Sequence, residues 1–385
     1  MSQPVVGRHT KIVCTLGPAS SSPEVIEKML RAGMDIARLN LAYSTFEEHS
    51  RLVSRVRRLS RKLGLPTGIL LDLPGPKRFN GDTKAVFGPH LEFALSQKAD
   101  FIALSFISTA RQVEAVKELL KEAKADTPLI VKIEKAQALA ECETILEECE
   151  GIMVARGDLA LEISIEKVPL AQKRLIREAN CRGKPVITAT EMLLSMVQSP
   201  TPSRAEATDV ANAVLDGSDA VMLSNETSVG KYPDISTDMM AKIALEAESA
   251  FPHQQVFEER CQEDRPEVND ATARAACQIA QQIQASAIVA FTTGGTTALR
   301  VSKYRPRQPI LAVTPSEITQ RRLSLLWGVV PIIKPGMPNL EEVFSLASEV
   351  ALKTGIAKTG ELIVITTGLP LGTPGSTNLV KVHRV

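Results

Sequence analysis

Short apolar runs alternate with amphipathic stretches from residue 11 to about residue 224. Each run has the length of a buried strand, and apolar positions between the runs recur at helical spacing. This pattern is typical of βα units around a parallel sheet. The predicted strands span residues 11–16, 36–39, 68–73, 101–104, 129–133, 151–154, 186–188 and 220–223. Eight such units favour an α/β fold of the (β/α)8 barrel type, or TIM barrel.

The pattern changes after residue 250. Residues 251–268 are charged and poorly periodic, which predicts a linker. A second α/β unit follows, so we expect a barrel domain over 1–250 and a C-terminal α/β domain over 269–385. Within the barrel, residues 74–90 are rich in Gly and Pro and are predicted to form a loop before a helix near Leu91.

Composition narrows the range of partners. The chain has 385 residues, with 45 Lys and Arg against 44 Asp and Glu, and its net charge is +1. This balance excludes a global attraction to nucleic acid or to an anionic membrane, so anion binding must be local. The six cysteines are not spaced as a zinc or redox motif. No signal peptide or membrane-spanning run is found, so a cytoplasmic protein is expected.

Polar residues follow almost every predicted strand, where barrels of this type place their reactive groups. Lys132 and Glu134 share one face of their strand, and Asp158 follows the next strand. A lysine with two carboxylates indicates a cation-assisted site for a substrate with several negative charges. For each residue taken alone, a solvated charge or a simple ion pair is the alternative. The strand-end residues are Arg38, Asn40, Asp72, Ser105, Lys132, Glu134, Arg156, Asp158, Thr190, Ser224 and Glu226.

Six ordered motifs resemble the pyruvate kinase family along nearly the whole chain. They are KIVCTLGPAS at 11–20, AGMDIARLN at 32–40, VKIE at 131–134, ARGDL at 155–159, PSRAEATDVANAVLDGSDAVML at 202–223 and GKYP at 230–233. One motif alone would be weak evidence, but the ordered set is specific. The resemblance implies a phosphotransferase of glycolysis that converts phosphoenolpyruvate and ADP to pyruvate and ATP.

The resemblance also implies roles for individual residues. Lys132 and Arg38 would contact the transferred phosphoryl group, and Thr190 would lie near the carbon that is protonated afterwards. Glu134 and Asp158 would bind Mg²⁺ or Mn²⁺. The substrate-binding set would comprise Ala155, Arg156, Gly157, Asp158, Thr190 and Ser105.

The chain departs from the family after the third strand. Family members carry a small lid domain there, and residues 74–90 take its place, so phosphoryl transfer is expected to be slowed. The potassium ligands of the family correspond to Asn40, Ala42, Asp72 and Leu73, two of which lack a side-chain oxygen. Lys77 corresponds to a lysine of potassium-independent relatives. We therefore expect its ammonium to replace the ion, so that potassium is not required.

The second domain contains a Gly- and Thr-rich turn before a helix. By resemblance it would bind the phosphate of a sugar-phosphate or nucleotide effector, and an ordinary turn with a helix cap is the alternative. The residues concerned are Thr292, Thr293, Gly294, Gly295, Thr296 and Thr297.

The resemblance further implies a homotetramer. Two other functions stay open at this point. One is a non-catalytic, metabolite-binding or regulatory relative of pyruvate kinase. The other is metal-dependent enolisation or decarboxylation of pyruvate or oxaloacetate, which the same lysine, metal and carboxylates could support.

Overall fold

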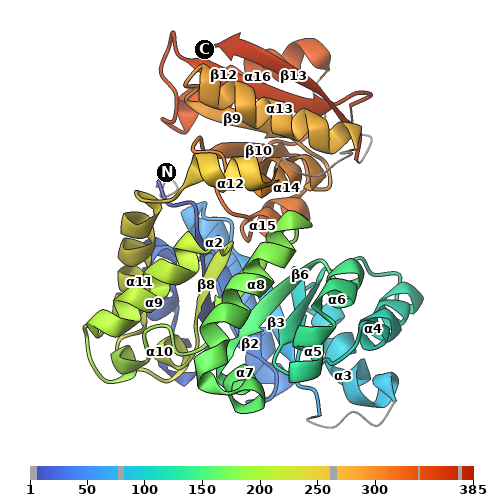
Figure 1. Cartoon of the computed structure of the whole chain (residues 1–385), viewed down its shortest axis with the longest axis vertical. Helices are drawn as coiled ribbons and strands as arrows, with labels where there is room; N and C mark the ends of the chain where they lie inside the picture. The colour runs from blue at the N-terminus through green and yellow to red at the C-terminus, as the bar shows by residue number, and fades with distance from the viewer. Residues whose placement is uncertain (1–6, 77–81, 261–266, 337–338, 372–374) are drawn as a thin grey trace. The chain divides into compact units, whose positions relative to one another are not determined.

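The computed structural model describes residues 7–76, 82–260, 267–336, 339–371 and 375–385. These residues form two compact units (Figure 1). One unit spans residues 10–249, and the other spans residues 250–385 together with the described residues 7–9. Each unit is built around its own sheet, so each can be described by itself.

The first unit is a closed barrel of parallel strands, as predicted. Each strand pairs with the next one along the chain, and β8 pairs with β1. The strands are β1 (Lys11–Thr15), β2 (Ile36–Asn40), β3 (Gly68–Leu73), β4 (Phe101–Leu104), β5 (Leu129–Ile133), β6 (Gly151–Ala155), β7 (Val186–Ala189) and β8 (Ala220–Leu223). The predicted bounds differ from these by at most one residue, because buried runs of this length are strongly marked in the sequence.

Side chains of these strands alternate between the barrel interior and the surrounding helices. The outward set joins the large core under the helices; it includes Ala37, Leu39, Leu71, Leu73, Val131 and Ile133. The residues between them, Arg38, Asp72 and Lys132, therefore point into the barrel. The period of two thus brings these three charged side chains to the same interior space.

Helices cover the outside of the barrel. They are α1 (Pro23–Ala32), α2 (Phe46–Leu63), α3 (Thr83–Ser96), α4 (Ala110–Glu122), α5 (Ala136–Ala140), α6 (Cys142–Glu148), α7 (Arg156–Ile163), α8 (Val168–Cys181), α9 (Arg204–Leu215), α10 (Asn225–Ser228) and α11 (Pro233–Glu248), with short 3₁₀ turns η1 (Pro18–Ser20), η2 (Ile165–Lys167) and η3 (Leu194–Val197). Within the described ranges, no helix is both long enough and apolar enough to cross a lipid bilayer.

The loop predicted over residues 74–90 is wrong in its second half, because α3 begins at Thr83. The side chain of Asp82 accepts a hydrogen bond from the amide of Ala85 and caps this helix. The Gly88–Pro89 pair resembles a helix breaker, because a proline inside a helix removes one hydrogen bond and its ring crowds the preceding turn, at a cost of about 3 kcal/mol. Burial of Phe87 on the barrel offsets this loss. Residues 77–81, which include Lys77, lie outside the described part of the chain.

The second unit contains a five-stranded sheet in the order β11-β10-β9-β12-β13. Its strands are β9 (Ala287–Phe291), β10 (Ile310–Thr314), β11 (Val329–Ile333), β12 (Leu362–Gly368) and β13 (Thr377–Arg384). All neighbours are parallel except β12 and β13. Helices cover both faces, since Ile288 packs in one core cluster and Val289 in another. The helices are α12 (His253–Arg260), α13 (Val268–Gln282), α14 (Thr296–Lys303), α15 (Glu317–Leu323) and α16 (Leu340–Lys353).

The linker predicted over residues 251–268 is also corrected by the structure. Helix α12 occupies His253–Arg260, and α13 begins at Val268. Phe257 of α12 packs against the core of the second unit, and Arg260 is buried with a hydrogen bond to the carbonyl of Lys303. These contacts order a segment whose own apolar pattern is weak, because tertiary packing contributes most of the stability of a short helix.

Candidate active site

A cluster of charged side chains lies in the barrel interior, at the carboxyl ends of β2, β3, β4 and β5. The carboxylate of Asp72 accepts hydrogen bonds from Nε and Nη2 of Arg38 at 3.0 and 2.6 Å, and from Oγ of Ser105 at 3.0 Å. Nζ of Lys132 lies 3.4 Å from Oδ2 of Asp72 and 2.7 Å from Oε1 of Glu134, and it donates to Ser105 at 2.9 Å. We call these five residues the Lys132 cluster.

The Lys132 cluster is almost closed to solvent and carries two charges of each sign. The side chains of Asp72 and Glu134 are 1% exposed, and that of Lys132 is 12% exposed. Burial opposes the charge on Asp72, but Lys132 and Arg38 outweigh it and hold the pKa of Asp72 below its ordinary value. Burial raises the pKa of Glu134, and Lys132 offsets only part of that rise. The cluster is therefore strongly coupled, with Asp72 ionised and Glu134 the easier carboxyl to protonate.

Sequence reasoning missed Thr15 as part of this site. Its Oγ1 accepts a hydrogen bond from Nη1 of Arg38 at 2.8 Å and donates to the carbonyl of Leu223. Thr15 thus fixes the third nitrogen of the Arg38 guanidinium across the barrel. The available signal was its place near the end of the first predicted strand, 11–16, since polar residues were expected to reach the site from strand ends.

Glu134 and Asp158 were predicted to bind a divalent cation, and carboxylate oxygens are the donor atoms that a hard cation prefers. Oε2 of Glu134 accepts from the amide of Phe106 at 2.8 Å, whereas the buried Oε1 makes no well-aligned hydrogen bond within the described residues. Asp158 lies in the first turn of α7, half-buried. In the described part of the chain, no three His, Cys, Asp or Glu side chains converge as a metal site. Two carboxylates suit a hard ion such as Mg²⁺, which keeps water and substrate oxygens as its other ligands.

Arg156 connects three elements around the start of α7. Its guanidinium donates to the carbonyls of Ala189 and Thr190 at 3.2 and 2.6 Å and pairs with Asp209 at 2.6 Å. Gln172 accepts from the same guanidinium at 3.3 Å. Neither Asp209 nor Gln172 was singled out from the sequence, because both lie inside helices far along the chain. The guanidinium is thus committed to the protein itself, and the substrate contact that the resemblance implies for Arg156 is through its backbone amide.

Thr190 lies beside α7 in a strained turn. Its φ is 71° and that of Glu191 is 54°, in the left-handed region that residues with a Cβ rarely adopt. Oγ1 of Thr190 accepts a hydrogen bond from the amide of Gly157 at 2.8 Å. This contact uses one of the amides on which the predicted carboxylate binding by Ala155, Gly157 and Asp158 depends. The structure therefore brings Thr190 together with the first turn of α7, at the ends of β7 and β6.

A pocket of about 740 Å³ opens at the ends of β1, β2 and β8. It is lined by Arg38, Asn40 and Tyr43, and by Arg51 and Arg55 of α2. The last two were not predicted as site residues, although their spacing of four places them on one face of a helix. Because Arg38 belongs both to this pocket and to the Lys132 cluster, the two sites adjoin.

The predicted effector turn of the second unit is held by its own side chains. Oγ1 of Thr292 accepts from the amide of Gly295 at 2.9 Å, and Gly295 adopts a φ of 95°. The carbonyl of Thr293 accepts from Oγ1 of Thr319 at 2.9 Å, and Thr297 bonds Thr377 of β13 at 2.8 Å. Gly294 has open space around its Cα. The turn from Thr292 to the start of α14 at Thr296 is thus held by hydrogen bonds within the second unit.

Gly75 offers a test of how tightly the cluster is packed. A Cβ at this position would collide with the carbonyl oxygen of Ser105, so Gly75→Ala is expected to lower the free energy of unfolding by about 1–3 kcal/mol. Gly88→Ala is the matched control. Its new Cβ meets nothing closer than 3.7 Å, and alanine should stabilise helix α3 by about 0.5–1 kcal/mol. Urea denaturation of both variants measures these changes in the free energy of unfolding. Equal stabilities of the two variants would contradict close packing around Gly75.

Two family models match the chain. The model described as pyruvate kinase, barrel domain, matches residues 7–88 and 86–237, and the model described as pyruvate kinase, alpha/beta domain, matches residues 270–383. The barrel match consists of two segments that overlap at residues 86–88, inside α3, the first helix after β3. Together the two models cover most of the chain.

Relatives named pyruvate kinase align with almost all of the chain. The protein of Geobacillus stearothermophilus is 36% identical over 472 aligned residues, that of a Staphylococcus aureus strain 36% over 471, and that of a Staphylococcus epidermidis strain 35% over 471. Each alignment covers 98% of this chain and 80% of the relative. Since the alignments are longer than the 385 residues of this chain, the relatives contain segments that have no counterpart in it.

Proposed function

The chain belongs to the pyruvate kinase family and is a phosphotransferase, and we propose that the Lys132 cluster is where it handles phosphoenolpyruvate. The observation that carries this assignment is the position of Lys132, which is nearly buried between Asp72 and Glu134 at the barrel's carboxyl end. Phosphoryl transfer to ADP needs charge neutralisation and alignment more than covalent chemistry. Two confined cations beside two carboxylates provide that environment.

We propose that an anionic phosphoryl group replaces Asp72 and Glu134 as the partner of Lys132 and Arg38 when substrate binds. In the structure both cations form ion pairs, Arg38 with Asp72 and Lys132 with Glu134. Glu134 and Asp158 would hold Mg²⁺ or Mn²⁺, which supplies further positive charge next to the phosphoryl oxygens. Oε1 of Glu134, which faces Lys132 in this structure, is the atom available for that ion. Thr190, beside the start of α7, would orient the group that protonates the product.

We propose that ADP binds in the adjoining pocket. Its volume of about 740 Å³ lies within the usual range for small-molecule sites. Arg55 and Arg51, the latter paired with Glu47, bring positive charge to a lining that also contains Glu48, and the shared Arg38 would place the terminal phosphate next to the Lys132 cluster. The segments that the relatives have in addition correspond, by our interpretation, to a lid, so turnover is proposed to be slower here because water is less fully excluded.

The test is to mix the purified protein with phosphoenolpyruvate, ADP and MgCl₂ and to follow pyruvate. Turnover supports the proposal. Binding of phosphoenolpyruvate without turnover would favour a regulatory relative instead. Metal-dependent enolisation or decarboxylation of pyruvate or oxaloacetate without ADP would favour the third function named above. A cytoplasmic location is part of the same proposal.

Potassium is not expected to be required. Both oxygens of Asp72 already accept hydrogen bonds from Arg38 and Ser105, and Oδ1 of Asn40 accepts one from the amide of Ala42 at 3.1 Å. These donors satisfy the oxygens that a monovalent ion would need. Activity titrated with KCl and with NaCl at constant ionic strength should give the same curve. A strong requirement for potassium alone would contradict this prediction, including the proposed role of Lys77.

We propose that the turn Thr292–Thr297 binds an effector phosphate through amides near its open Gly294. Its glycines let the backbone approach an anion closely. Titration of the activity with sugar phosphates and nucleotides tests this proposal. An activity that none of these compounds changes would indicate an ordinary helix-capping turn.

We propose a homo-oligomer, with a tetramer as the family implies, in which another copy covers α7, η2 and α8. Leu161, Ile165 and Leu170 on these elements are 84, 77 and 72% exposed, which is costly for three large apolar side chains in water. Leu161→Asp should therefore reduce the mass measured by light scattering, whereas Leu245→Asp on α11 should not. A wild-type chain that is monomeric at micromolar concentration would contradict the proposal.

A further inference from the structure

Thr15 is a buried residue of the barrel to which the proposed reaction assigns no role. It is the last residue of β1, it is 5% exposed, and it lines the pocket of about 740 Å³ together with Arg38. In the parallel pairing of β1 with β2, its Cα lies opposite that of Arg38. Thr15 therefore stands beside the guanidinium that is proposed to contact the phosphoryl group.

The hydroxyl of Thr15 has one proton, and its two neighbours decide where that proton goes. Oγ1 lies 2.9 Å from the carbonyl oxygen of Leu223 in β8, which can only accept a hydrogen bond. Nη1 of Arg38 lies 2.8 Å from Oγ1 and can only donate. Oγ1 thus donates to Leu223 and accepts from Arg38, so a lone pair of the hydroxyl is directed at the guanidinium.

The backbone around Thr15 is held by α10, the short helix after β8. The carbonyl of Thr15 accepts a hydrogen bond from Oγ1 of Thr227 at 2.8 Å, and Thr227 is fully buried. Two residues further on, a Cβ at Gly17 would lie 2.6 Å from the carbonyl oxygen of Ser228, so this segment packs tightly against α10. The Thr15 hydroxyl therefore has a fixed position on which the mobile side chain of an arginine can be anchored.

Arg38 donates three hydrogen bonds to described residues, and they lie on two sides of its guanidinium. Nε and Nη2 donate to Asp72 at 3.0 and 2.6 Å, and Nη1 donates to Thr15. A phosphoryl group that replaces Asp72 would accept from the Nε–Nη2 edge, whose parallel N–H groups suit two phosphate oxygens. Of the three bonds, only the one to Thr15 then remains to hold the plane of the guanidinium.

We propose that Thr15 is a positioning residue, whose hydroxyl holds Nη1 of Arg38 so that the Nε–Nη2 edge meets the phosphoryl oxygens of phosphoenolpyruvate. This role rests on the proposed function, because it takes Arg38 to be a phosphoryl contact. Thr15 acts through Arg38 and not on the substrate itself. Loss of its hydroxyl should therefore weaken binding of a ligand with a phosphoryl group and spare a ligand without one.

Thr15→Val removes the hydroxyl and keeps the branched shape of the side chain. Calorimetry of the full chain with MgCl₂ should give a dissociation constant for phosphoenolpyruvate about tenfold higher than that of wild type, as expected for one lost hydrogen bond to a charged group. The dissociation constant for oxalate, a dicarboxylate without a phosphoryl group, should stay within about twofold. Thr15→Ser keeps the hydroxyl and should restore the affinity for phosphoenolpyruvate to within about threefold of wild type.

A double-mutant cycle separates positioning from a general loss of structure. Arg38→Met should weaken binding of phosphoenolpyruvate, and adding Thr15→Val to it should change the dissociation constant by less than about twofold, since the guanidinium is already gone. A further tenfold loss in the double variant would show that Thr15 acts by another route. Thr15→Ala, which lacks the hydroxyl and adds no bulk, repeats the comparison without any risk of overpacking.

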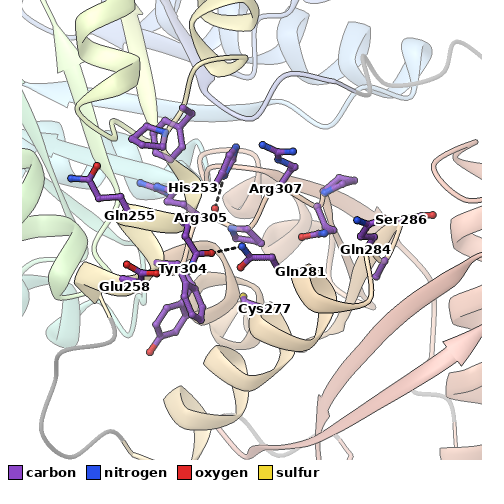
Figure 2. A pocket seen from close by; sticks show the side chains of 18 residues that line it. His253, Gln255, Glu258, Cys277, Gln281, Gln284, Ser286, Tyr304, Arg305 and Arg307 are labelled. Atoms are coloured by element: carbon purple, nitrogen blue, oxygen red, sulfur yellow. Dashed lines mark hydrogen bonds between the residues drawn. The ribbon is translucent and has the colours of Figure 1, made fainter.

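Two controls remove a buried hydroxyl elsewhere. Thr67→Val makes the same change just before β3, at the other end of the barrel, where Oγ1 of Thr67 donates to the carbonyl of Leu65 at 3.2 Å. Tyr304→Phe does so in the second unit, where the tyrosine lines the cavity that Figure 2 shows and its hydroxyl donates to Asp270 at 2.7 Å. Both should bind phosphoenolpyruvate within about twofold of wild type.

The outcomes distinguish this role from the proposed function. Equal weakening of phosphoenolpyruvate and oxalate by Thr15→Val would overturn the positioning role, as would a Thr15→Ser protein that binds no better than Thr15→Val. Wild-type affinity in Thr15→Val, with binding weakened in Arg38→Met, would overturn the role of Thr15 and leave the contact of Arg38 intact. Wild-type affinity in Arg38→Met would overturn that contact, and the role of Thr15 with it.

Discussion

Lys132→Met is expected to lower the turnover of phosphoenolpyruvate and ADP by about 10²–10³-fold. Lys132 is the cation that approaches both carboxylates of its cluster, at 3.4 Å from Asp72 and 2.7 Å from Glu134. Methionine keeps most of the side-chain volume and removes the charge. The effect on turnover should therefore come from lost electrostatic stabilisation, and steady-state assays with saturating substrates measure it.

The matched control for this prediction is Lys121→Met on the exposed side of α4. It makes the same chemical change outside the barrel interior and should leave turnover within about twofold of wild type, since surface charges contribute little. Thermal melts of both variants separate lost activity from lost folding. Wild-type turnover in a folded Lys132→Met protein would show that the cluster is not the phosphoryl site.

Arg156→Met is expected to lower the free energy of unfolding by about 3 kcal/mol, because it leaves the carbonyls of Ala189 and Thr190 without their donor and the partly exposed Asp209 without its cation. The Arg156 side chain is 12% exposed and holds Asp209 together with the carbonyls of Ala189 and Thr190. For a unit of this size, that loss should lower Tm by about 6–12 °C. Differential scanning calorimetry measures the shift.

Turnover should also fall in Arg156→Met, because the left-handed turn at Thr190 and Glu191 loses the bonds that hold it. Arg174→Met provides the comparison, since Arg174 makes an i,i+4 pair with Glu178 and is 49% exposed. Such a surface pair should contribute less than about 1 kcal/mol. Equal melting temperatures for the two variants would mean that Arg156 does not stabilise the barrel through these contacts.

The strand-end residues illustrate what the sequence could predict. A period of two along each strand decides which side chains point inward, and a closed parallel barrel brings all strand ends to the same rim. Arg38, Asp72, Ser105 and Lys132 could therefore be placed together before their contacts were known. The same local patterns gave the bounds of β1 to β8 almost to the residue.

Local patterns were misleading where packing with distant residues decided the outcome. Gly88 and Pro89 indicated a loop, yet Phe87 and its neighbours bury enough apolar surface to complete α3. The charged stretch from residue 251 indicated a linker, yet Phe257 and Arg260 find partners in the second unit and order α12. The helix propensity of a segment predicts its structure only weakly, because tertiary contacts can override it.

By itself, the sequence determined the barrel, the second α/β unit, the family and the rim at which the reactive groups meet. Only the tertiary structure decided how those groups pair: Asp72 with Arg38 and Ser105, Arg156 with Asp209, and the hydroxyl of Thr15 with Arg38. The reason is physical. Periodicity is a local property of the chain, whereas hydrogen bonds and charge pairing depend on distances of a few ångströms and on burial, which residues far apart in sequence create together.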